Sequence, residues 1–167
     1  FILSPTKNKE WEMGFLEFRE YALILLEVSK ISCVTPVIIG TKDDEYIIQK
    51  IINHLPKDFK FVNLLGKTNI NEVINLIKKS KFVIANDNGI HHLSNFLNKR
   101  TLTLYNFSSP DTFNWNNKNS SYIFNSKFDC MPCVGNNIGP FDNYPFKCPW
   151  NIRCKYTITS NEIIKKL

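Results

Sequence analysis

Hydrophobic residues along the chain switch repeatedly between two patterns, which predicts strands that alternate with helices. Short apolar runs bounded by turn residues are typical of buried strands, and apolar residues three and four apart are typical of one helix face. The runs that predict strands are 1–3, 34–40, 59–66, 82–85 and 101–105. The stripes that predict helices span 11–29, 47–55, 70–77 and 90–97, and a closing helix covers 160–167 with Ser160 as its N-cap.

Strands that alternate with helices predict an α/β fold with a parallel sheet covered by helices. Residues 107–157 are rich in Asn, Ser, Pro, Phe and Cys and show little periodicity, so we expect a loop-rich tail within a single domain over 1–167. The first residues already have the pattern of a strand, and no Met precedes them. We therefore interpret the sequence as a piece of a longer protein whose missing part precedes residue 1.

Composition and charge limit the kind of partner. The 167 residues are 43% hydrophobic and carry a net charge of +6, which suits an anionic ligand. Because no run of Lys and Arg exceeds two residues, we do not expect nucleic-acid binding. No stretch approaches the roughly 20 apolar residues of a membrane span, and the start lacks a secretory signal. We expect a cytoplasmic protein with at most peripheral membrane association.

The loop after the fourth predicted strand has the features of an anion site. Asn or Asp here can cap the next helix, and Gly89 lets the backbone approach a ligand. The N–H groups of the first helical turn then bind a phosphate well, and His92 can donate to the same anion. We expect Asp87 to cap the helix and shape the loop rather than to accept a proton. The alternative is a capped helix with a packed histidine.

Two further loops follow strands at the same edge. Ser4, Thr6 and Lys9 follow the first strand, and their hydroxyl and ammonium groups suit a phosphate; the alternative is a solvated basic loop. Asp43 and Asp44 follow the second strand, where a carboxylate can accept from ribose hydroxyls. We expect Asp44, or failing it Asp43, to do so; the alternative is a helix cap. Neither a P-loop nor a G-x-G-x-x-G sequence is present. Together the three loops outline a site for a nucleoside diphosphate.

The cysteines allow three interpretations. Cys130 and Cys133 form a C-x-x-C pair, and Cys148 and Cys154 follow with a looser spacing. They can hold a structural metal, pack as reduced thiols in loops, or form disulfides. Cys33 lies near a strand, and we expect it to be a buried thiol.

Several short motifs follow one another over essentially the whole chain. They are Lys9–Trp11, Gly66-Lys67-Thr68, Asp87-Asn88-Gly89-Ile90-His91-His92, Ser108-Ser109-Pro110 and the cysteine-bearing tail. In their order and spacing they resemble the C-terminal half of glycosyltransferase family 9, the bacterial heptosyltransferases.

The resemblance implies the donor-binding Rossmann-like half of an inverting GT-B glycosyltransferase. It implies ADP-heptose as the donor, no required metal or cofactor, and a lipopolysaccharide or related glycan acceptor bound by an N-terminal domain that this chain lacks. It also implies that Lys9, Lys67 and Thr68 belong to the donor site, and that His92 stabilises the leaving diphosphate. The general base is then expected in the missing domain. The enzyme is expected in the cytoplasm, at the inner face of the bacterial inner membrane. The alternatives are a UDP- or GDP-sugar transferase and a non-catalytic nucleotide-binding module.

Overall fold

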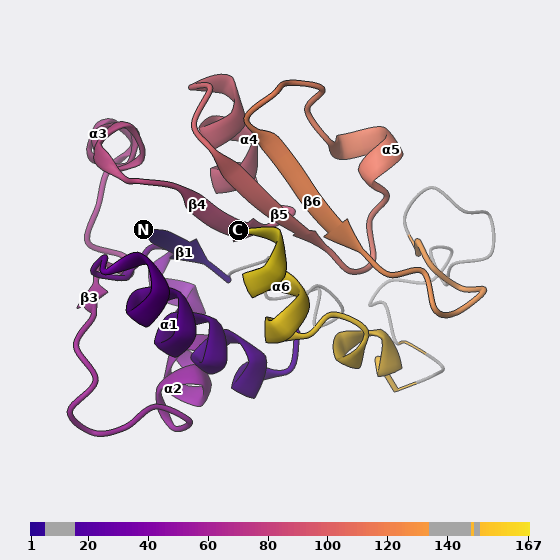
Figure 1. Cartoon of the computed structure of the whole chain (residues 1–167), viewed down its shortest axis with the longest axis horizontal. Helices are drawn as coiled ribbons and strands as arrows, with labels where there is room; N and C mark the ends of the chain where they lie inside the picture. The colour runs from indigo at the N-terminus through magenta and orange to yellow at the C-terminus, as the bar shows by residue number, and fades with distance from the viewer. Residues whose placement is uncertain (6–15, 134–147, 149–150) are drawn as a thin grey trace.

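A six-stranded parallel sheet forms the centre of the computed structural model, which describes residues 1–5, 16–133, 148 and 151–167 (Figure 1). The strand order is β3-β2-β1-β4-β5-β6, the order of a Rossmann-like doubly wound sheet. The strands are β1 Ile2–Ser4, β2 Val37–Ile38, β3 Val62–Asn63, β4 Val83–Asn86, β5 Thr101–Tyr105 and β6 Ser120–Phe124. The predicted α/β class and the five predicted strands are confirmed.

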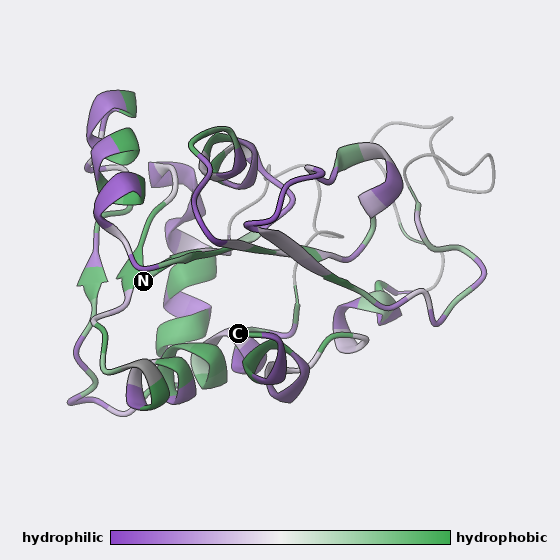
Figure 2. Cartoon of the chain, turned by 45° about the horizontal axis from the view of Figure 1, so that its top comes forward, coloured by the Kyte–Doolittle hydropathy of each residue, from purple (hydrophilic) through white to green (hydrophobic). Residues whose placement is uncertain are grey.

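Helices cover both faces of this sheet (Figure 2). The helical segments are α1 Phe18–Ser32, η2 Lys42–Asp44, α2 Glu45–Ile52, α3 Ile70–Lys79, α4 Gly89–Phe96, α5 Pro110–Phe113, η3 Arg153–Tyr156 and α6 Ser160–Lys166. Residues of α1, α2 and α6 pack with Leu3, Ile38 and Ile84 in one core cluster. Residues of α3 and α4 pack with Ile2 and Val83 in a second cluster. Neighbouring strand residues thus point to opposite faces, and both faces are buried.

The stretch 107–157 contains more regular structure than its composition predicts. Strand β6 pairs in parallel with the whole of β5, and Pro110 begins the short helix α5 after the cap Ser109. All five residues of β6 are partly or well exposed, because β6 is the edge strand of the sheet. An edge strand needs no continuous apolar run, and periodicity therefore does not reveal it.

Two predicted helix starts differ from the observed ones. Thr159, not Ser160, is the N-cap of α6: its hydroxyl accepts from Glu162 N–H while the Glu162 carboxylate accepts from Thr159 N–H. Ser160 is the first helical residue and donates its N–H to Glu20 on α1. The first helix begins at Phe18, and the predicted residues 11–15 lie outside the described part of the chain. Within that part, no helix is both long and apolar enough to cross a membrane.

Candidate functional site

The carboxyl ends of β1 and β4 meet at the point where the strand order reverses, which is where ligands bind in open α/β sheets. Ser4 ends β1 and Asn86 ends β4. The Asn88 side-chain amide donates to the Ser4 carbonyl oxygen at 3.3 Å and to its Oγ at 3.1 Å. The buried Asn86 amide donates to Pro5 O and accepts from the Tyr21 hydroxyl. The two predicted loops are therefore joined by side-chain hydrogen bonds.

Asn88 is the N-cap of α4, and the prediction that Asp87 caps this helix is wrong. The Asn88 Oδ1 atom accepts from Ile90 N at 2.9 Å and from His91 N at 3.2 Å. These two N–H groups are therefore satisfied within the protein, and the expectation that they lie open to an anion is wrong. The space beside Gly89 is open: a Cβ there would meet nothing within 4 Å.

Asp87 lies instead between the two histidines of α4. Its Oδ1 atom is 3.4 Å from Nδ1 of the fully buried His91 and 3.7 Å from Nε2 of the half-exposed His92. The Trp115 indole N–H donates to His92 Nδ1 at 3.0 Å. The sequence does not reveal this contact, because Trp115 comes from the segment after α5 and reaches His92 only through the fold.

The Trp115 contact defines the protonation pattern of His92. Because Nδ1 accepts from the indole, the proton of the neutral imidazole is assigned to Nε2. Asp87, His91 and His92 have ligand atoms within 4.8 Å of one another, a set that suits a transition metal. A metal ligand needs a free lone pair, which a protonated Nε2 lacks. The arrangement therefore fits His92 as a hydrogen-bond donor better than as a metal ligand.

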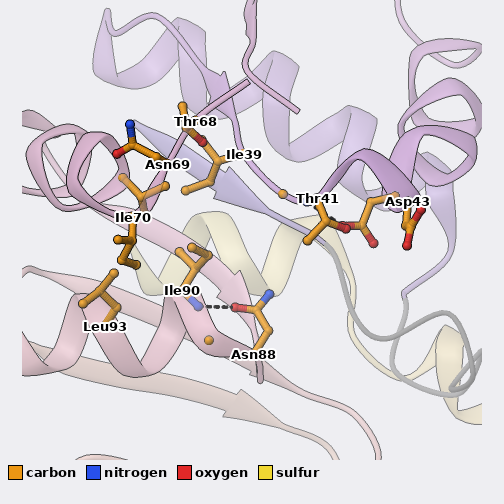
Figure 3. A pocket seen from close by; sticks show the side chains of 13 residues that line it. Ile39, Thr41, Asp43, Thr68, Asn69, Ile70, Asn88, Ile90 and Leu93 are labelled. Atoms are coloured by element: carbon orange, nitrogen blue, oxygen red, sulfur yellow. Dashed lines mark hydrogen bonds between the residues drawn. The ribbon is translucent and has the colours of Figure 1, made fainter. Parts of the chain in front are cut away.

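A cavity of about 690 Å³ opens beside the N-terminus of α4 (Figure 3). One wall is apolar and includes Ile70, Ile90 and Leu93, while Thr41 and Asp43 lie on the opposite side. Of the predicted site residues, the structure brings together Asp43, Asp44, Thr68, Asn88 and Gly89 in this lining. Ser4, Lys67, Asp87 and His92 are not among the described residues that line it.

The two carboxylates after β2 have different surroundings. Asp44 is only 5% exposed, and its Oδ2 atom accepts from Thr41 N at 2.8 Å and from Thr41 Oγ1 at 2.6 Å. This is the helix-cap alternative that the sequence left open. Asp43 is exposed at the rim of the cavity. The geometry therefore favours Asp43 over Asp44 as an acceptor for a ligand.

The loop after β3 closes against the loop after β2. Gly66 has φ +62°, and a Cβ there would lie 2.9 Å from the Lys42 Cβ, so a glycine is required. Thr68 then reaches the cavity. The Lys67 ammonium donates to Asn63 O at 3.2 Å, back along its own loop. The predicted residues Thr6 and Lys9 lie outside the described residues.

All five cysteines are free thiols. Burial first, and then the neighbouring cysteines, raise the pKa of Cys133 to about 11 and that of Cys154 to about 12. Among the described residues, the group whose ligand atoms lie close together consists of Asp87, His91 and His92. The four cysteines of the tail are not in this group. The packing and metal interpretations of the cysteines both stay predictions. Cys33 is exposed at the end of α1, so its predicted burial is wrong.

The strand order, the helices on both faces and the cavity at the switch point define a Rossmann-like α/β domain. The family model of glycosyltransferase family 9 (heptosyltransferase) matches residues 4–139, and the chain belongs to this family.

The share of this chain that is matched differs between relatives, and the chain covers less than half of each of the three relatives described next. The lipooligosaccharide heptosyltransferase 2 of Haemophilus influenzae is 37% identical over 73 residues, which are 42% of this chain and 21% of that protein. The iron-containing heptosyltransferase TibC, solved with ADP-D-beta-D-heptose, has a TM-score of 0.74 at 18% identity and matches 99% of this chain and 44% of its own. The Escherichia coli heptosyltransferase WaaC with ADP has a TM-score of 0.67 at 15% identity and matches 99% and 42%. The chain thus spans less than half the length of these solved proteins.

Proposed function

We propose that this chain is the donor-binding part of an inverting heptosyltransferase that uses ADP-heptose. The observation that carries the proposal is a cavity with an apolar wall and a polar rim at the switch point of a Rossmann-like sheet. Ile70 in that wall is 62% exposed, so its side chain is accessible to a flat apolar group in the cavity. Family membership supports the reaction class, and the ligands of the two solved relatives support the nucleotide.

The cavity suggests an order for the parts of the donor. The adenine packs against Ile70, Ile90 and Leu93, and the ribose hydroxyls donate to Asp43 across the cavity. The diphosphate then lies beside Gly89 at the N-terminus of α4. The helix dipole favours negative charge there, whereas the Ile90 and His91 N–H groups already donate to Asn88. Ser4, Thr68 and Gly89 border this path, with Thr6, Lys9 and Lys67 as further polar contacts from neighbouring loops.

His92 and Asp87 flank Asn88 and Gly89 along the chain, and neither is among the described residues that line the cavity. In the proposed reaction the acceptor hydroxyl displaces the diphosphate in a single step, and negative charge builds on the leaving oxygen. The His92 Nε2–H, held by the Trp115 contact, donates to that charge. The chain needs no metal for this step in the proposed mechanism. The Asp87 carboxylate repels a phosphate and therefore accepts from a sugar hydroxyl.

The remaining parts of the enzyme are assigned to a preceding N-terminal domain. That domain binds the lipopolysaccharide or related glycan acceptor and supplies the general base. Closure of the two domains excludes water from the donor. In this proposal the complete enzyme is cytoplasmic and works at the inner face of the inner membrane, with at most peripheral membrane contact.

Calorimetry of this chain with ADP, UDP and GDP tests the proposal. We expect ADP to bind at least about tenfold more tightly than the other two. Ile70→Ala removes part of the apolar wall and should weaken ADP binding about fivefold, the effect of roughly 1 kcal/mol of apolar contact. Phe96→Ala is the matched control, because Phe96 is 72% exposed on α4 and does not line the cavity. Preference for UDP or GDP, or equal effects of the two variants, would contradict the proposal.

A further inference from the structure

His91 is a fully buried histidine between two polar groups of the site. Its Nε2 atom is 3.3 Å from the Tyr105 hydroxyl of β5, and its Nδ1 atom is 3.4 Å from Asp87 Oδ1. The Tyr105 ring meets the imidazole edge-on, with ring centroids 5.7 Å apart. The motif that assigns a role to His92 assigns none to His91.

A histidine at this position needs an explanation, because burial of an imidazole nitrogen without a hydrogen bond is unfavourable. Nδ1 of His91 is buried and has no hydrogen-bond partner in the described part of the chain, although Asp87 lies within ion-pair distance. At 3.4 Å the contact is longer than an ordinary N–H···O hydrogen bond. Contacts of this kind in ligand-free sites often shorten when the ligand binds.

The neighbours of His91 determine which nitrogen carries the proton. Burial first, and then the charge of Asp87 and the nearby Tyr122, raise the pKa of Tyr105 above its usual range, so its hydroxyl keeps its proton. That proton can be donated to His91 Nε2. The Asp87 carboxylate on the other side favours a proton on Nδ1. The two contacts therefore have a defined direction. Tyr105 O–H donates to His91 Nε2, and His91 Nδ1–H points towards Asp87.

We propose that His91 is a positioning residue, whose Nδ1–H closes onto Asp87 Oδ1 when the sugar nucleotide binds and fixes the carboxylate that receives a sugar hydroxyl. The same oxygen atom lies 3.7 Å from His92 Nε2, so the two imidazoles compete for it. When Asp87 Oδ1 pairs with His91, the His92 Nε2–H is available to donate to the diphosphate. This inference rests on the proposed function, because it assigns the sugar half of the donor to Asp87.

Nitrogen-15 NMR of the histidine-labelled chain tests the proton positions directly. We expect His91 to be protonated on Nδ1 and His92 on Nε2, and we expect ADP-heptose to shift the His91 Nδ1 signal towards that of a stronger hydrogen bond. Tyr105→Phe should disturb the His91 tautomer. Tyr122→Phe is the control, because it removes a hydroxyl from the ring that packs on the other partner, Tyr105. A His91 protonated on Nε2, or unchanged when ADP-heptose binds, would overturn the inference.

Binding measurements separate positioning from packing. In His91→Met, which keeps the size of the side chain, we expect ADP-heptose to bind about fivefold to tenfold more weakly while ADP changes less than about twofold. Asp87→Asn should have the same selective effect, and the double variant should be no worse than Asp87→Asn alone. Ile163→Val in the buried face of α6 is a control for general loss of packing.

The failures are distinguishable from one another. If the unaltered chain binds neither ADP nor ADP-heptose, the proposed function is wrong. If it binds both and His91→Met weakens them equally, His91 is only a packing residue and the inference is wrong. If His91→Met does not fold, Tyr105→Phe takes its place, and the inference requires a selective loss of ADP-heptose affinity in that variant.

Discussion

Asp43 and Asp44 are neighbours in sequence, but the fold gives their carboxylates different tasks. Asp44 is buried and holds the Thr41 N–H and hydroxyl, while Asp43 faces the cavity rim. A hydrogen bond to a charged side chain contributes roughly 1.5–3 kcal/mol, and a helix cap about 1 kcal/mol. One residue is therefore expected to affect the ligand and the other the stability of the chain.

Substitution of these two residues should separate the effects. Asp43→Asn should weaken ADP binding by about 1.5–3 kcal/mol and leave the unfolding free energy within about 0.5 kcal/mol of its original value. Asp44→Asn should lower the unfolding free energy by about 1 kcal/mol. Calorimetry with ADP and 2′-deoxy-ADP, together with urea unfolding, measures both. The deoxy compound should bind more weakly to the unaltered chain, and this difference should shrink in Asp43→Asn; equal binding would remove Asp43 from the ribose site.

At the scale of elements, the capping box of α6 connects the end of the chain to the edge of the sheet. The Glu162 carboxylate accepts from Thr159 N–H and from the Asn125 side chain, which also donates to Thr157 O at 2.7 Å. Asn125 directly follows β6. One carboxylate therefore stabilises both the helix start and the exit of the edge strand.

The pKa of Glu162 predicts how this junction responds to acid. Burial acts to raise its pKa, but the hydrogen bonds from Thr159 and Asn125 outweigh burial and hold the pKa below its usual value. A native pKa below the unfolded one stabilises the fold above the unfolded pKa, and that stability is lost as the pH falls through the native pKa. Glu162→Gln should therefore reduce stability at neutral pH and match the unaltered chain in strong acid, as measured by thermal unfolding against pH. A constant difference at all pH values would contradict this.

At the scale of the whole molecule, the carboxylates of the described site loops already have other roles, and Asp43 is the one proposed for the ribose. Asp44 holds a helix start, and Asp87 lies against two imidazoles. An inverting transfer needs a base on the face opposite the leaving group. The proposal assigns that base to a preceding domain.

The isolated chain should therefore bind ADP and transfer no sugar. A longer chain that includes the preceding domain should transfer heptose, and in that chain His92→Ala should lower turnover more than it weakens ADP binding, because its hydrogen bond is strongest when charge builds on the leaving group. The checks are a transfer assay with ADP-heptose and calorimetry on the same samples. Efficient transfer by the 167 residues alone would place the base within this chain.

Sequence predicted the sheet and its main helices because the central strands are buried on both faces and must be apolar. It missed β6, which lies at the edge, where half-exposed residues suffice. It placed Asn88 and Gly89 at the cavity, since a loop at a known strand end has few possible positions. It could not find the contacts of Tyr105 with His91 or Trp115 with His92, which join residues 14 and 23 positions apart through tertiary packing.

Strand β1 lies in the middle of the sheet, between β2 and β4, although it is formed by Ile2–Ser4. Within the described sheet, β1 pairs with both β2 and β4 and so joins the half-sheet β2-β3 to the half-sheet β4-β5-β6. The nitrogen of Phe1 donates to Thr35 O at 3.0 Å, and a peptide N–H at that position can make the same bond. A split version that begins at residue 16 would therefore lack the strand that joins the two half-sheets. A short synthetic peptide with the β1 sequence should restore the sheet when it is added to this split version.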